Sequence, residues 1–210
     1  MTLEELIKEL AKYKVSSKTL EAMKIIKREY FVEDKKKAYL NEALPFYSQT
    51  TSQPLVIANV IDNLELNKED VVIEAGTGSG FQTCLLAFFS KKVFSFEIDE
   101  IIFNAAQKNI QNFMEINKDL DLKIELIKGN IFKSEKLINQ IIETEGKIDK
   151  VVFSFAIKKI PDIFVKNAKI IIAPIEENNN YQKLKKIVIK DGKIFEKDLG
   201  LVSFVKQREE

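Results

Sequence analysis

A glycine-rich loop at residues 74–80 has the spacing that points most directly to ligand binding. It reads Glu-Ala-Gly-Thr-Gly-Ser-Gly and stands between a predicted strand, residues 71–73, and a predicted helix, residues 82–90. Glycines allow a tight turn and a close approach of the backbone to a ligand. The following helix offers free N–H groups and the positive end of its dipole. Loops of this kind bind nucleotide-like ligands at the carboxyl ends of parallel strands.

The acids beside this loop narrow the choice of ligand. Phe81 occupies the sixth position of the loop, so the dinucleotide fingerprint Gly-x-Gly-x-x-Gly is not met. An acid just before Gly-x-Gly-x-Gly instead indicates S-adenosylmethionine (SAM), with Glu74 holding its cationic end. Glu97 ends the next predicted strand, where a carboxylate can accept both ribose hydroxyls. The structural alternative is an ordinary turn with two solvated acids, although three glycines in five residues weaken the start of a helix.

The composition excludes several kinds of active site. The 210 residues include no histidine and one cysteine, Cys84, which we expect to be buried and inert. A Ser-His-Asp triad and a Cys-His pair are impossible, and no metal site is expected because most zinc sites are built from His and Cys. One cysteine cannot form an internal disulfide, which fits a reducing, cytoplasmic compartment. The net charge of +1 gives no strong attraction to nucleic acid or anionic lipid.

Hydrophobic periodicity predicts helices in the first part of the chain. Apolar residues recur at helical spacing over residues 3–13 and again over 19–30, where Ser16-Ser17 supplies cap candidates. An irregular segment, residues 31–53, follows. Ser52 then precedes Gln53-Pro54 as the expected N-cap of a third helix, because Ser is favoured there and Pro is tolerated in the first turn. No segment approaches the ~18 uninterrupted apolar residues of a membrane-spanning helix.

From residue 69 onward, strand and helix signals alternate. Short β-branched runs without polar alternation are typical of strands buried on both faces, and their alternation with helices predicts a parallel sheet covered on both sides. The C-terminal end differs, since Asp191-Gly192 is a strong hairpin signal. The predicted strands are residues 71–73, 93–97, 122–127, 151–154, 170–173, 183–190, 194–198 and 201–205, and the predicted helices are residues 82–90, 99–112 and 135–143.

No linker divides the chain, so the sequence predicts one domain over residues 1–210. We expect residues 1–53 to form a helical and substrate-loop extension, and residues 54–210 to form a SAM-binding core. The predicted fold class is α/β. It is a doubly wound, Rossmann-like sheet with a parallel core, antiparallel strands at the C-terminal end and added N-terminal helices.

Taken in order, the motifs resemble those of the protein-L-isoaspartate O-methyltransferase family. The most distinctive is Gln49–Pro54, Gln-Thr-Thr-Ser-Gln-Pro, which is similar to the family's Gln-Thr-Ile-Ser-Gln-Pro. The likeness covers roughly residues 20 to 206. Its other parts are Arg-Glu-Tyr-Phe-Val at 28–32, Ala-Tyr at 38–39, Leu-Pro at 44–45, the glycine loop at 72–82, Ser-Phe-Glu at 95–97, Ile-Pro at 160–161, Gln182 and Val-Ser-Phe-Val at 202–205.

The resemblance implies a SAM-dependent carboxyl methyltransferase of the SAM-methyltransferase fold that methylates L-isoaspartyl residues in damaged proteins, a repair activity. It implies Ser52 as the catalytic residue at the reacting carboxylate; plain N-capping is the alternative role of that hydroxyl. A carboxylate with a reference pKa near 3.9 is already ionised at pH 7, so no histidine base is needed. The implied cofactor-binding residues are Thr50, Thr51, Glu74, Ala75, Gly76, Thr77, Gly78, Gly80, Glu97, Ile98, Asn130, Ile131 and Gln182, and the implied substrate residues are Phe46, Tyr47, Ser48, Ser52 and Ser154.

Four segments depart from the family pattern. Phe46-Tyr47-Ser48 replaces glycines in the loop that contacts the peptide, and Asn130 stands where the family has an Asp facing the adenine. Asn can still accept a hydrogen bond through its carbonyl oxygen. Residues 154–157, Ser-Phe-Ala-Ile, are bulkier than the family's alanines, and residues 167–169 replace a Gly-Gly turn. These differences predict a divergent member with altered substrate preference or lower activity.

Two other functions stay open at this stage. One is a methyltransferase for another acceptor, such as tRNA or a small carboxylate; the other is a SAM-binding domain that no longer catalyses. The basic runs at 35–37 and 183–186 are expected to be solvated surface rather than a nucleic-acid site. Phe88, Phe89, Phe94 and Phe96 are expected in the core, while Phe46, Tyr47 and Phe155 could wall a substrate pocket. Residues 176–180 are expected to form a polar turn, and the protein is expected to be a monomer without membrane or nucleic-acid partners.

Overall fold

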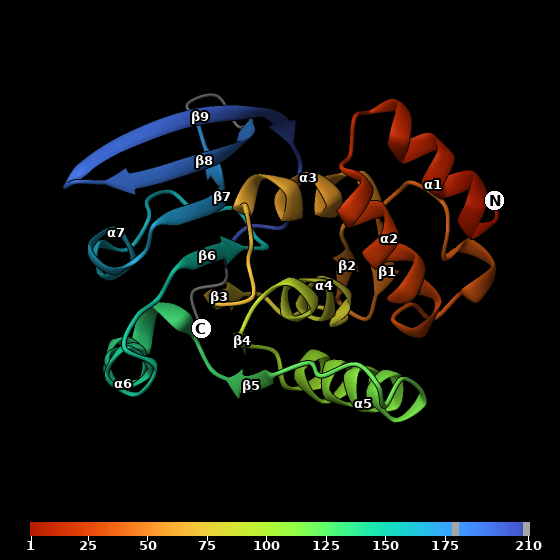
Figure 1. The fold of residues 1–210 in the computed structure, drawn as a ribbon, viewed down its shortest axis with the longest axis horizontal. Helices are drawn as coiled ribbons and strands as arrows, with labels where there is room; N and C mark the ends of the chain where they lie inside the picture. Colours follow the sequence, from red (N-terminus) through yellow and green to blue (C-terminus); the bar gives the residue numbers. More distant parts are fainter. Residues whose placement is uncertain (178–180, 208–210) are drawn as a thin grey trace.

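A seven-stranded sheet runs through the middle of the molecule (Figure 1). The computed structural model describes residues 1–177 and 181–207. The strand order is β5-β4-β3-β6-β7-β8-β9, parallel from β5 to β7 and antiparallel from β7 to β9. The strands are β3 Val71–Ala75, β4 Lys92–Glu97, β5 Ile124–Lys128, β6 Lys150–Phe153, β7 Ile170–Glu176, β8 Gln182–Lys190 and β9 Lys193–Val202. The predicted parallel core with antiparallel C-terminal strands is confirmed.

Helices cover both faces of this sheet (Figure 1). Val72 belongs to an apolar cluster with α3, α4 and α5, whereas its neighbours Val71 and Ile73 belong to the cluster with α6 and α7. Successive strand residues point to opposite faces, so an unbroken β-branched run fits a strand buried on both sides. The helices are α1 Leu3–Lys12, α2 Ser17–Ile25, α3 Pro54–Leu64, α4 Phe81–Phe89, α5 Glu100–Ile116, α6 Glu135–Glu145 and α7 Asp162–Asn167.

The N-terminal helices pack on the α3–α4 side of the core. Ser16, one of the two expected cap candidates, caps α2. At α1, the Thr2 side chain and Glu5 form a capping box that was not predicted. The expected helix over residues 19–30 is wrong in its second half. Helix α2 ends at Ile25, and a separate 3₁₀ turn, Arg28–Tyr30, follows. The reason is that the chain turns there to bury the Arg28 side chain beneath the following loop.

A small hairpin occupies the segment expected to be irregular. Its strands are β1 Leu44–Phe46 and β2 Gln49–Thr51, joined through Tyr47-Ser48. The expected capping of α3 by Ser52 is wrong. The N-cap is Gln53, and no side chain of its own caps the helix; instead the Asn41 side chain accepts a hydrogen bond from Leu55 N at 3.1 Å. Because Asn41 in the preceding loop caps α3, the Ser52 hydroxyl is not used for capping.

The C-terminal hairpin β8–β9 turns at Asp191-Gly192, as predicted. A separate strand over residues 201–205 is wrong, because β9 continues without a break to Val202. The segment after it returns to the middle of the sheet, where Lys206 bridges Ala156. Helix α7 was not predicted, since it has only six residues. Of the predicted polar turn at 176–180, Glu176 ends β7, and residues 178–180 lie outside the described part.

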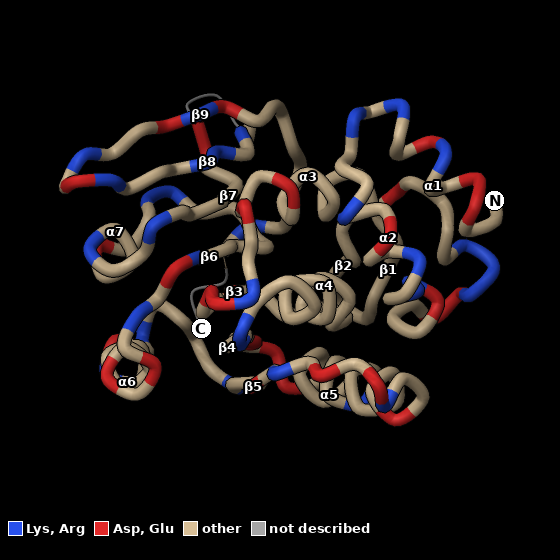
Figure 2. Tube along the Cα trace, in the orientation of Figure 1, with Lys and Arg blue, Asp and Glu red and all other residues tan. Residues whose placement is uncertain are grey.

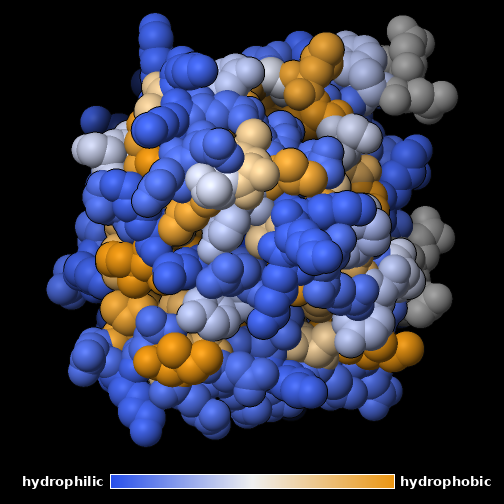
Figure 3. All heavy atoms as spheres, turned by 90° about the vertical axis from the view of Figure 1, so that its right-hand side faces the viewer, coloured by the Kyte–Doolittle hydropathy of each residue, from blue (hydrophilic) through white to orange (hydrophobic). Residues whose placement is uncertain are grey.

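Charges of both signs alternate over the described chain (Figure 2), and its apolar surface residues form separate patches on the face of Figure 3. Lys183, Lys185 and Lys186 each form ion pairs. Lys183 and Lys185 are partly exposed, whereas the expected solvated surface is wrong for Lys186, which is buried. Within residues 1–177 and 181–207, no helix is long and apolar enough to cross a membrane. Cys84, Phe94 and Phe96 are buried as expected, whereas Phe88 and Phe89 are only partly buried at the edge of the core.

Candidate cofactor and substrate pocket

A pocket opens at the carboxyl ends of the parallel strands. Strand β3 has β4 on one side and β6 on the other, so the order in which strands are added to the sheet reverses at β3. Open α/β sheets bind ligands at such a switch point. The space in the pocket, counted together with the open solvent at its mouth, is about 940 Å³. Its lining comes from β2, the end of β4, helices α3, α4 and α5, and the segments that follow β2, β3, β4, β5, β6 and β9: Gln49, Thr50, Thr51, Ser52, Ile57, Gly76, Thr77, Gly78, Ser79, Phe81, Gln82, Phe96, Glu97, Ile98, Ile102, Gly129, Asn130, Ile131, Phe132, Ser154, Phe155, Val205 and Lys206.

The glycine loop between β3 and α4 forms the floor of this pocket. Its start is fixed to the next strand, because Gly76 N and Thr77 N both donate to the Phe96 carbonyl oxygen, at 2.8 and 3.2 Å. Gly76 has a φ of 94°, and a Cβ there would lie 3.1 Å from the Phe155 ring. A side chain at this position would meet both backbone strain and a crowded wall. The glycine therefore lets the loop run directly beneath residues 154 and 155.

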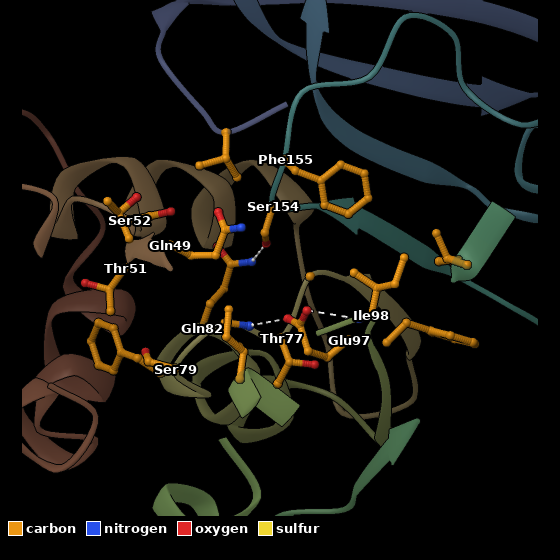
Figure 4. A pocket seen from close by; sticks show the side chains of 18 of the residues that line it. Gln49, Thr51, Ser52, Thr77, Ser79, Gln82, Glu97, Ile98, Ser154 and Phe155 are labelled. Atoms are coloured by element: carbon orange, nitrogen blue, oxygen red, sulfur yellow. Dashed lines mark hydrogen bonds between the residues drawn. The ribbon is translucent and has the colours of Figure 1, made fainter. Parts of the chain in front are cut away.

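Glu97 lies at the carboxyl end of β4, on the side of the pocket shown at the right of Figure 4. Its Oε2 accepts from Gly78 N at 3.1 Å, and its Oε1 accepts from Ile98 N at 2.9 Å and Asp99 N at 3.1 Å. Burial raises the pKa of this carboxyl above its usual value, while those backbone hydrogen bonds oppose the shift. The carboxylate is thus held rigidly, and carboxylate oxygens can accept further bonds from hydroxyl groups.

Glu74 lies behind the pocket wall rather than in it. The side chain is fully buried, and its Oε2 accepts from the Thr83 and Ser95 hydroxyls at 2.5 and 2.7 Å. Burial raises the pKa of Glu74 to about 7, against three hydrogen bonds that lower it. The residue expected to touch the cationic end of the ligand is therefore separated from the pocket by other side chains.

Gln82 is the side chain that joins Glu74 to the pocket. Its amide nitrogen donates to Glu74 Oε1 at 2.9 Å and to Ser154 Oγ at 2.8 Å, the second bond being drawn in Figure 4. Both Gln82 and Ser154 line the pocket. Sequence reasoning missed Gln82 as a site residue, although its place in the first turn of the helix after the loop was a usable signal.

Ser52 lies at the opposite end of the pocket from Glu97 (Figure 4). It is half-buried and follows β2, whose last residue, Thr51, is buried. The Thr51 hydroxyl accepts from Arg28 Nη2 at 2.8 Å, and the Ser52 carbonyl oxygen accepts from the same nitrogen at 3.0 Å. The backbone that carries the Ser52 hydroxyl is therefore fixed from below by a buried guanidinium.

Asn130 lines the pocket just after β5. Its side-chain oxygen accepts from Phe132 N at 2.9 Å and caps the 3₁₀ turn Ile131–Lys133. The oxygen expected to face an adenine amino group thus already accepts a backbone hydrogen bond. Contact with adenine stays a prediction.

The C-terminal segment closes one wall. Val205 and Lys206 line the pocket, and backbone hydrogen bonds join the Val205 carbonyl oxygen to Ala156 N and Gln207 N to the Ala156 carbonyl oxygen, at 2.8 and 3.0 Å. Gln182 fastens the same segment. Its side chain donates to the Phe204 carbonyl oxygen at 3.0 Å and accepts from Phe204 N at 2.6 Å. Both amide atoms of Gln182 thus hold the chain rather than face the pocket.

Most of the predicted site residues meet in this one pocket. Seven do not line it: the structure places Phe46 in the core and Tyr47 and Ser48 at the exposed hairpin turn, and the others are Glu74, Ala75, Gly80 and Gln182. Phe155 lines the pocket, which agrees with its expected role as a pocket wall. Sequence reasoning missed Gln49, Ile57, Ser79, Phe81, Gln82, Phe96, Ile102, Gly129, Phe132, Val205 and Lys206 as lining residues. Several of these adjoin predicted residues, so only their direction was unknown.

Comparison with known proteins gives a consistent result. The family model described as protein-L-isoaspartate(D-aspartate) O-methyltransferase matches residues 1–210. The protein-L-isoaspartate O-methyltransferase of Fervidobacterium nodosum is 32% identical over 95% of this chain and 98% of its own length. That of Dictyoglomus turgidum is 30% identical over 90% and 83%.

A solved structure is similar over the whole fold. It is described as a putative protein-L-isoaspartate O-methyltransferase from Plasmodium falciparum in complex with S-adenosyl-L-homocysteine, and it has a TM-score of 0.84, 21% identity and full coverage of both chains. This likeness supports the fold. The family-wide match and the two bacterial relatives together decide the assignment, and the chain belongs to the protein-L-isoaspartate(D-aspartate) O-methyltransferase family.

Proposed function

We propose that this chain, a SAM-dependent enzyme of the protein-L-isoaspartate O-methyltransferase family, methylates the α-carboxylate of L-isoaspartyl residues in damaged proteins. The observation that carries the proposal is one pocket with two distinct ends. Glu97 lies at the end suited to a ribose, and Ser52 lies at the other end, with the glycine loop between them. That arrangement suits a reaction between a bound nucleoside-like methyl donor and an acceptor that enters beside Ser52.

SAM, when bound, supplies a methyl group on a positively charged sulfur. In the proposal, Glu97 accepts hydrogen bonds from the ribose hydroxyls, and the loop from Gly76 to Ser79 supports the rest of the ligand. Asn130, Ile98 and Ile131 would contact the base. Glu74 contributes through Gln82, because its own carboxylate is fully buried. Each of these residues fits a ligand of this kind by charge and position.

Ser52 would orient the acceptor carboxylate. The acceptor is ionised at neutral pH, so the reaction needs alignment of the carboxylate oxygen, methyl carbon and sulfur but no general base. Orientation of this kind can lower the activation barrier by roughly 7–11 kcal/mol. A hydroxyl that is not occupied by capping α3 is available to donate to a carboxylate oxygen. Thr51, which is fixed by Arg28, holds the adjoining backbone.

The first test is methyl transfer from labelled SAM to an isoaspartyl peptide. We expect Ser52→Ala to lower turnover by about 10²-fold, since misplacement of a substrate by about 1 Å has effects of that size. SAM affinity should stay within about twofold of the wild-type value, and Ser52→Thr should keep part of the activity. The matched control is Ser17→Ala, a serine at the exposed start of α2.

Three results would contradict the proposal. Undiminished turnover of Ser52→Ala would remove Ser52 from the mechanism. No transfer by the wild-type chain, beside an active control enzyme, would remove the isoaspartyl substrate. Salt-sensitive methylation of tRNA would favour a different acceptor, although the paired lysines of β8 do not offer a basic patch.

We also propose that the protein acts as a monomeric single domain in the cytoplasm. Two observations support this proposal. One apolar cluster joins α1 and α2 to the sheet, and the one cysteine is free and buried. A reducing compartment is the usual place for such a cysteine. Light scattering coupled to gel filtration would test the oligomeric state, and a mass twice that of the chain would contradict it.

A further inference from the structure

Arg28 carries a buried positive charge. Its side chain is only 2% exposed, and among the described residues no carboxylate forms an ion pair with it. Its Nη atoms instead donate to five neutral oxygens, and its Nε has no partner. The acceptors are the carbonyl oxygens of Ala38, Leu40, Glu42 and Ser52, at 3.3, 3.1, 3.0 and 3.0 Å, and the Thr51 hydroxyl at 2.8 Å.

Burying the Arg28 charge costs more free energy than the fixing of a loop would require. Burial of a charge without a counter-ion is strongly unfavourable, and neutral acceptors compensate it only in part. Burial lowers the pKa of Arg28 to about 10, so the guanidinium is still charged at neutral pH. The attraction that raises this pKa comes from Glu42, which is exposed to solvent. The charge therefore calls for an explanation beyond the hydrogen bonds.

The charge faces one end of the pocket. Two of its five acceptors belong to Thr51 and Ser52, which line the pocket. The guanidinium therefore lies within about two residue lengths, or ~8 Å, of the Ser52 hydroxyl. The acid Glu97 lies toward the other end, and Glu74 is buried behind the pocket wall. In a poorly solvated interior a charge acts over such distances with little screening.

We propose that Arg28 is a specificity-determining residue, whose buried charge makes the Ser52 end of the pocket select an anionic carboxylate over a neutral group of the same shape. This inference rests on the proposed function and adds the residue that supplies the selection. Arg28 contacts Thr51 and Ser52 and not the reacting atoms, so it acts by position and by its field. The acceptor carboxylate would provide the missing counter-ion.

The Arg28 charge should affect substrate binding and the chemical step differently. Methyl transfer removes the negative charge of the acceptor, so the attraction to Arg28 is strongest in the bound substrate and weaker in the transition state. An interaction that stabilises the ground state at least as much as the transition state mainly affects KM. Loss of the charge should therefore raise the KM for the peptide without lowering kcat.

The test compares two peptides of one sequence, one with a free isoaspartyl α-carboxylate and one with an α-carboxamide. Their affinities are measured by calorimetry on the full chain saturated with S-adenosylhomocysteine. We expect the wild-type chain to bind the carboxylate peptide at least tenfold more tightly. Arg28→Met should bring this ratio close to one, while Arg28→Lys, which keeps the charge, should retain a clear preference. Lys24→Met, which removes an exposed cation from α2, should leave the ratio unchanged.

The outcomes separate a field from a purely structural anchor. An Arg28→Met chain that is less stable but keeps the tenfold preference would overturn the proposal. If Arg28→Met does not fold, the wild-type protein and Arg28→Lys still test the proposal. An affinity ratio of carboxylate to carboxamide peptide near one in either of them would overturn it. These are binding measurements, so they stand apart from turnover. A wild-type chain that discriminates but does not methylate would contradict the proposed function alone.

Discussion

Gly80 and Ile110 meet where the glycine loop passes over α5. Gly80 is the N-cap of α4 and has a φ of 89°, a conformation that residues with a side chain rarely adopt. A Cβ at this position would lie 2.8 Å from Ile110 Cγ1 and 2.9 Å from its Cδ1. The third glycine of the motif is therefore required by packing of the loop on the helix. It does not line the pocket, although sequence reasoning assigned it to the cofactor.

We predict that Gly80→Ala destabilises the protein by about 2–3 kcal/mol, the sum of a left-handed backbone and an overpacked contact. Gly78→Ala is the matched control. Gly78 also has a positive φ, of 55°, but nothing lies within 4 Å of its Cβ position, so a loss near 1 kcal/mol is expected. Urea unfolding measures both. In the double variant Gly80→Ala/Ile110→Val, the smaller side chain at residue 110 should restore part of the lost unfolding free energy. Equal losses of stability in Gly80→Ala and Gly78→Ala would contradict this account.

Residue types could be predicted from the sequence better than side-chain directions. Glu97 was found because an acid at the end of a strand has one obvious orientation. Glu74 was placed in the pocket, but its direction depends on Thr83 and Ser95, which approach from two other elements. Ser52 was expected to cap α3, but Asn41 supplies the cap, and no local pattern connects residues 41 and 55. Contacts between distant segments are what the sequence pattern does not contain.

At the scale of elements, the C-terminal segment 203–207 is held by few contacts beside the pocket. Among the described residues it is held by two hydrogen bonds between Gln182 and Phe204, two backbone bonds with Ala156 and the ion pair of Lys206 with Glu176 at 3.8 Å. It packs at the carboxyl end of β6 and brings Val205 and Lys206 to the pocket wall. Segments with so few bonds open at low free-energy cost. Gln182 thus sets how firmly one wall of the pocket is closed.

We predict that Gln182→Leu loosens this wall and raises the KM for the isoaspartyl peptide several-fold, with a change in unfolding free energy of about 2 kcal/mol or less. The reason is that leucine keeps the volume but cannot bond the Phe204 backbone. Limited proteolysis should show earlier cleavage near residue 204 in the variant. Tyr181→Leu, a change at the exposed neighbouring residue, is the control. An unchanged KM together with unchanged proteolysis would show that the segment is held without Gln182.

Regular elements were predictable where one local signal decided them. The buried β-branched runs marked β3 and β7, and Asp99 caps α5 as expected, accepting from Ile101 N and Ile102 N. Errors arose where tertiary contacts override local preference. Helix α2 ends early because Arg28 turns inward, and the β1–β2 hairpin forms although Tyr47 must adopt a φ of 52°. The predicted α/β fold class was still correct, because it depends on several strands that were each predicted independently.

At the scale of the whole molecule, the absence of histidine simplifies its response to pH. No imidazole titrates between pH 5 and 8, so the side chains that change charge in that range are those with displaced pKa values. Glu74 is the main one, with its pKa raised from 4.5 to about 7. Burial shifts Glu97 in the same direction. The carboxyls of Glu65, Glu145 and Asp149 have lowered pKa values and respond only in acid.

We predict that stability falls as the pH rises from 5 to 8. The folded chain holds a proton on Glu74 that the unfolded chain has lost, so this contribution is complete below about pH 4.5 and disappears as the pH passes 7. A shift of this size corresponds to about 3 kcal/mol. Urea unfolding at several pH values should show the slope in the wild type and only the smaller part due to Glu97 in Glu74→Gln. Parallel curves for the two chains would contradict the assignment.

The bond from Gln82 to Glu74 has a thermodynamic consequence for ligand binding. A sulfonium cation beside Gln82 favours the ionised form of a carboxyl that is half protonated near pH 7, so binding of SAM should expel a fraction of a proton into solution. S-adenosylhomocysteine lacks the sulfur charge and should expel less. Calorimetry in two buffers of different ionisation enthalpy would measure the difference, and equal proton release for both ligands would refute it. The pH of the cell would then affect how readily bound S-adenosylhomocysteine is exchanged for SAM.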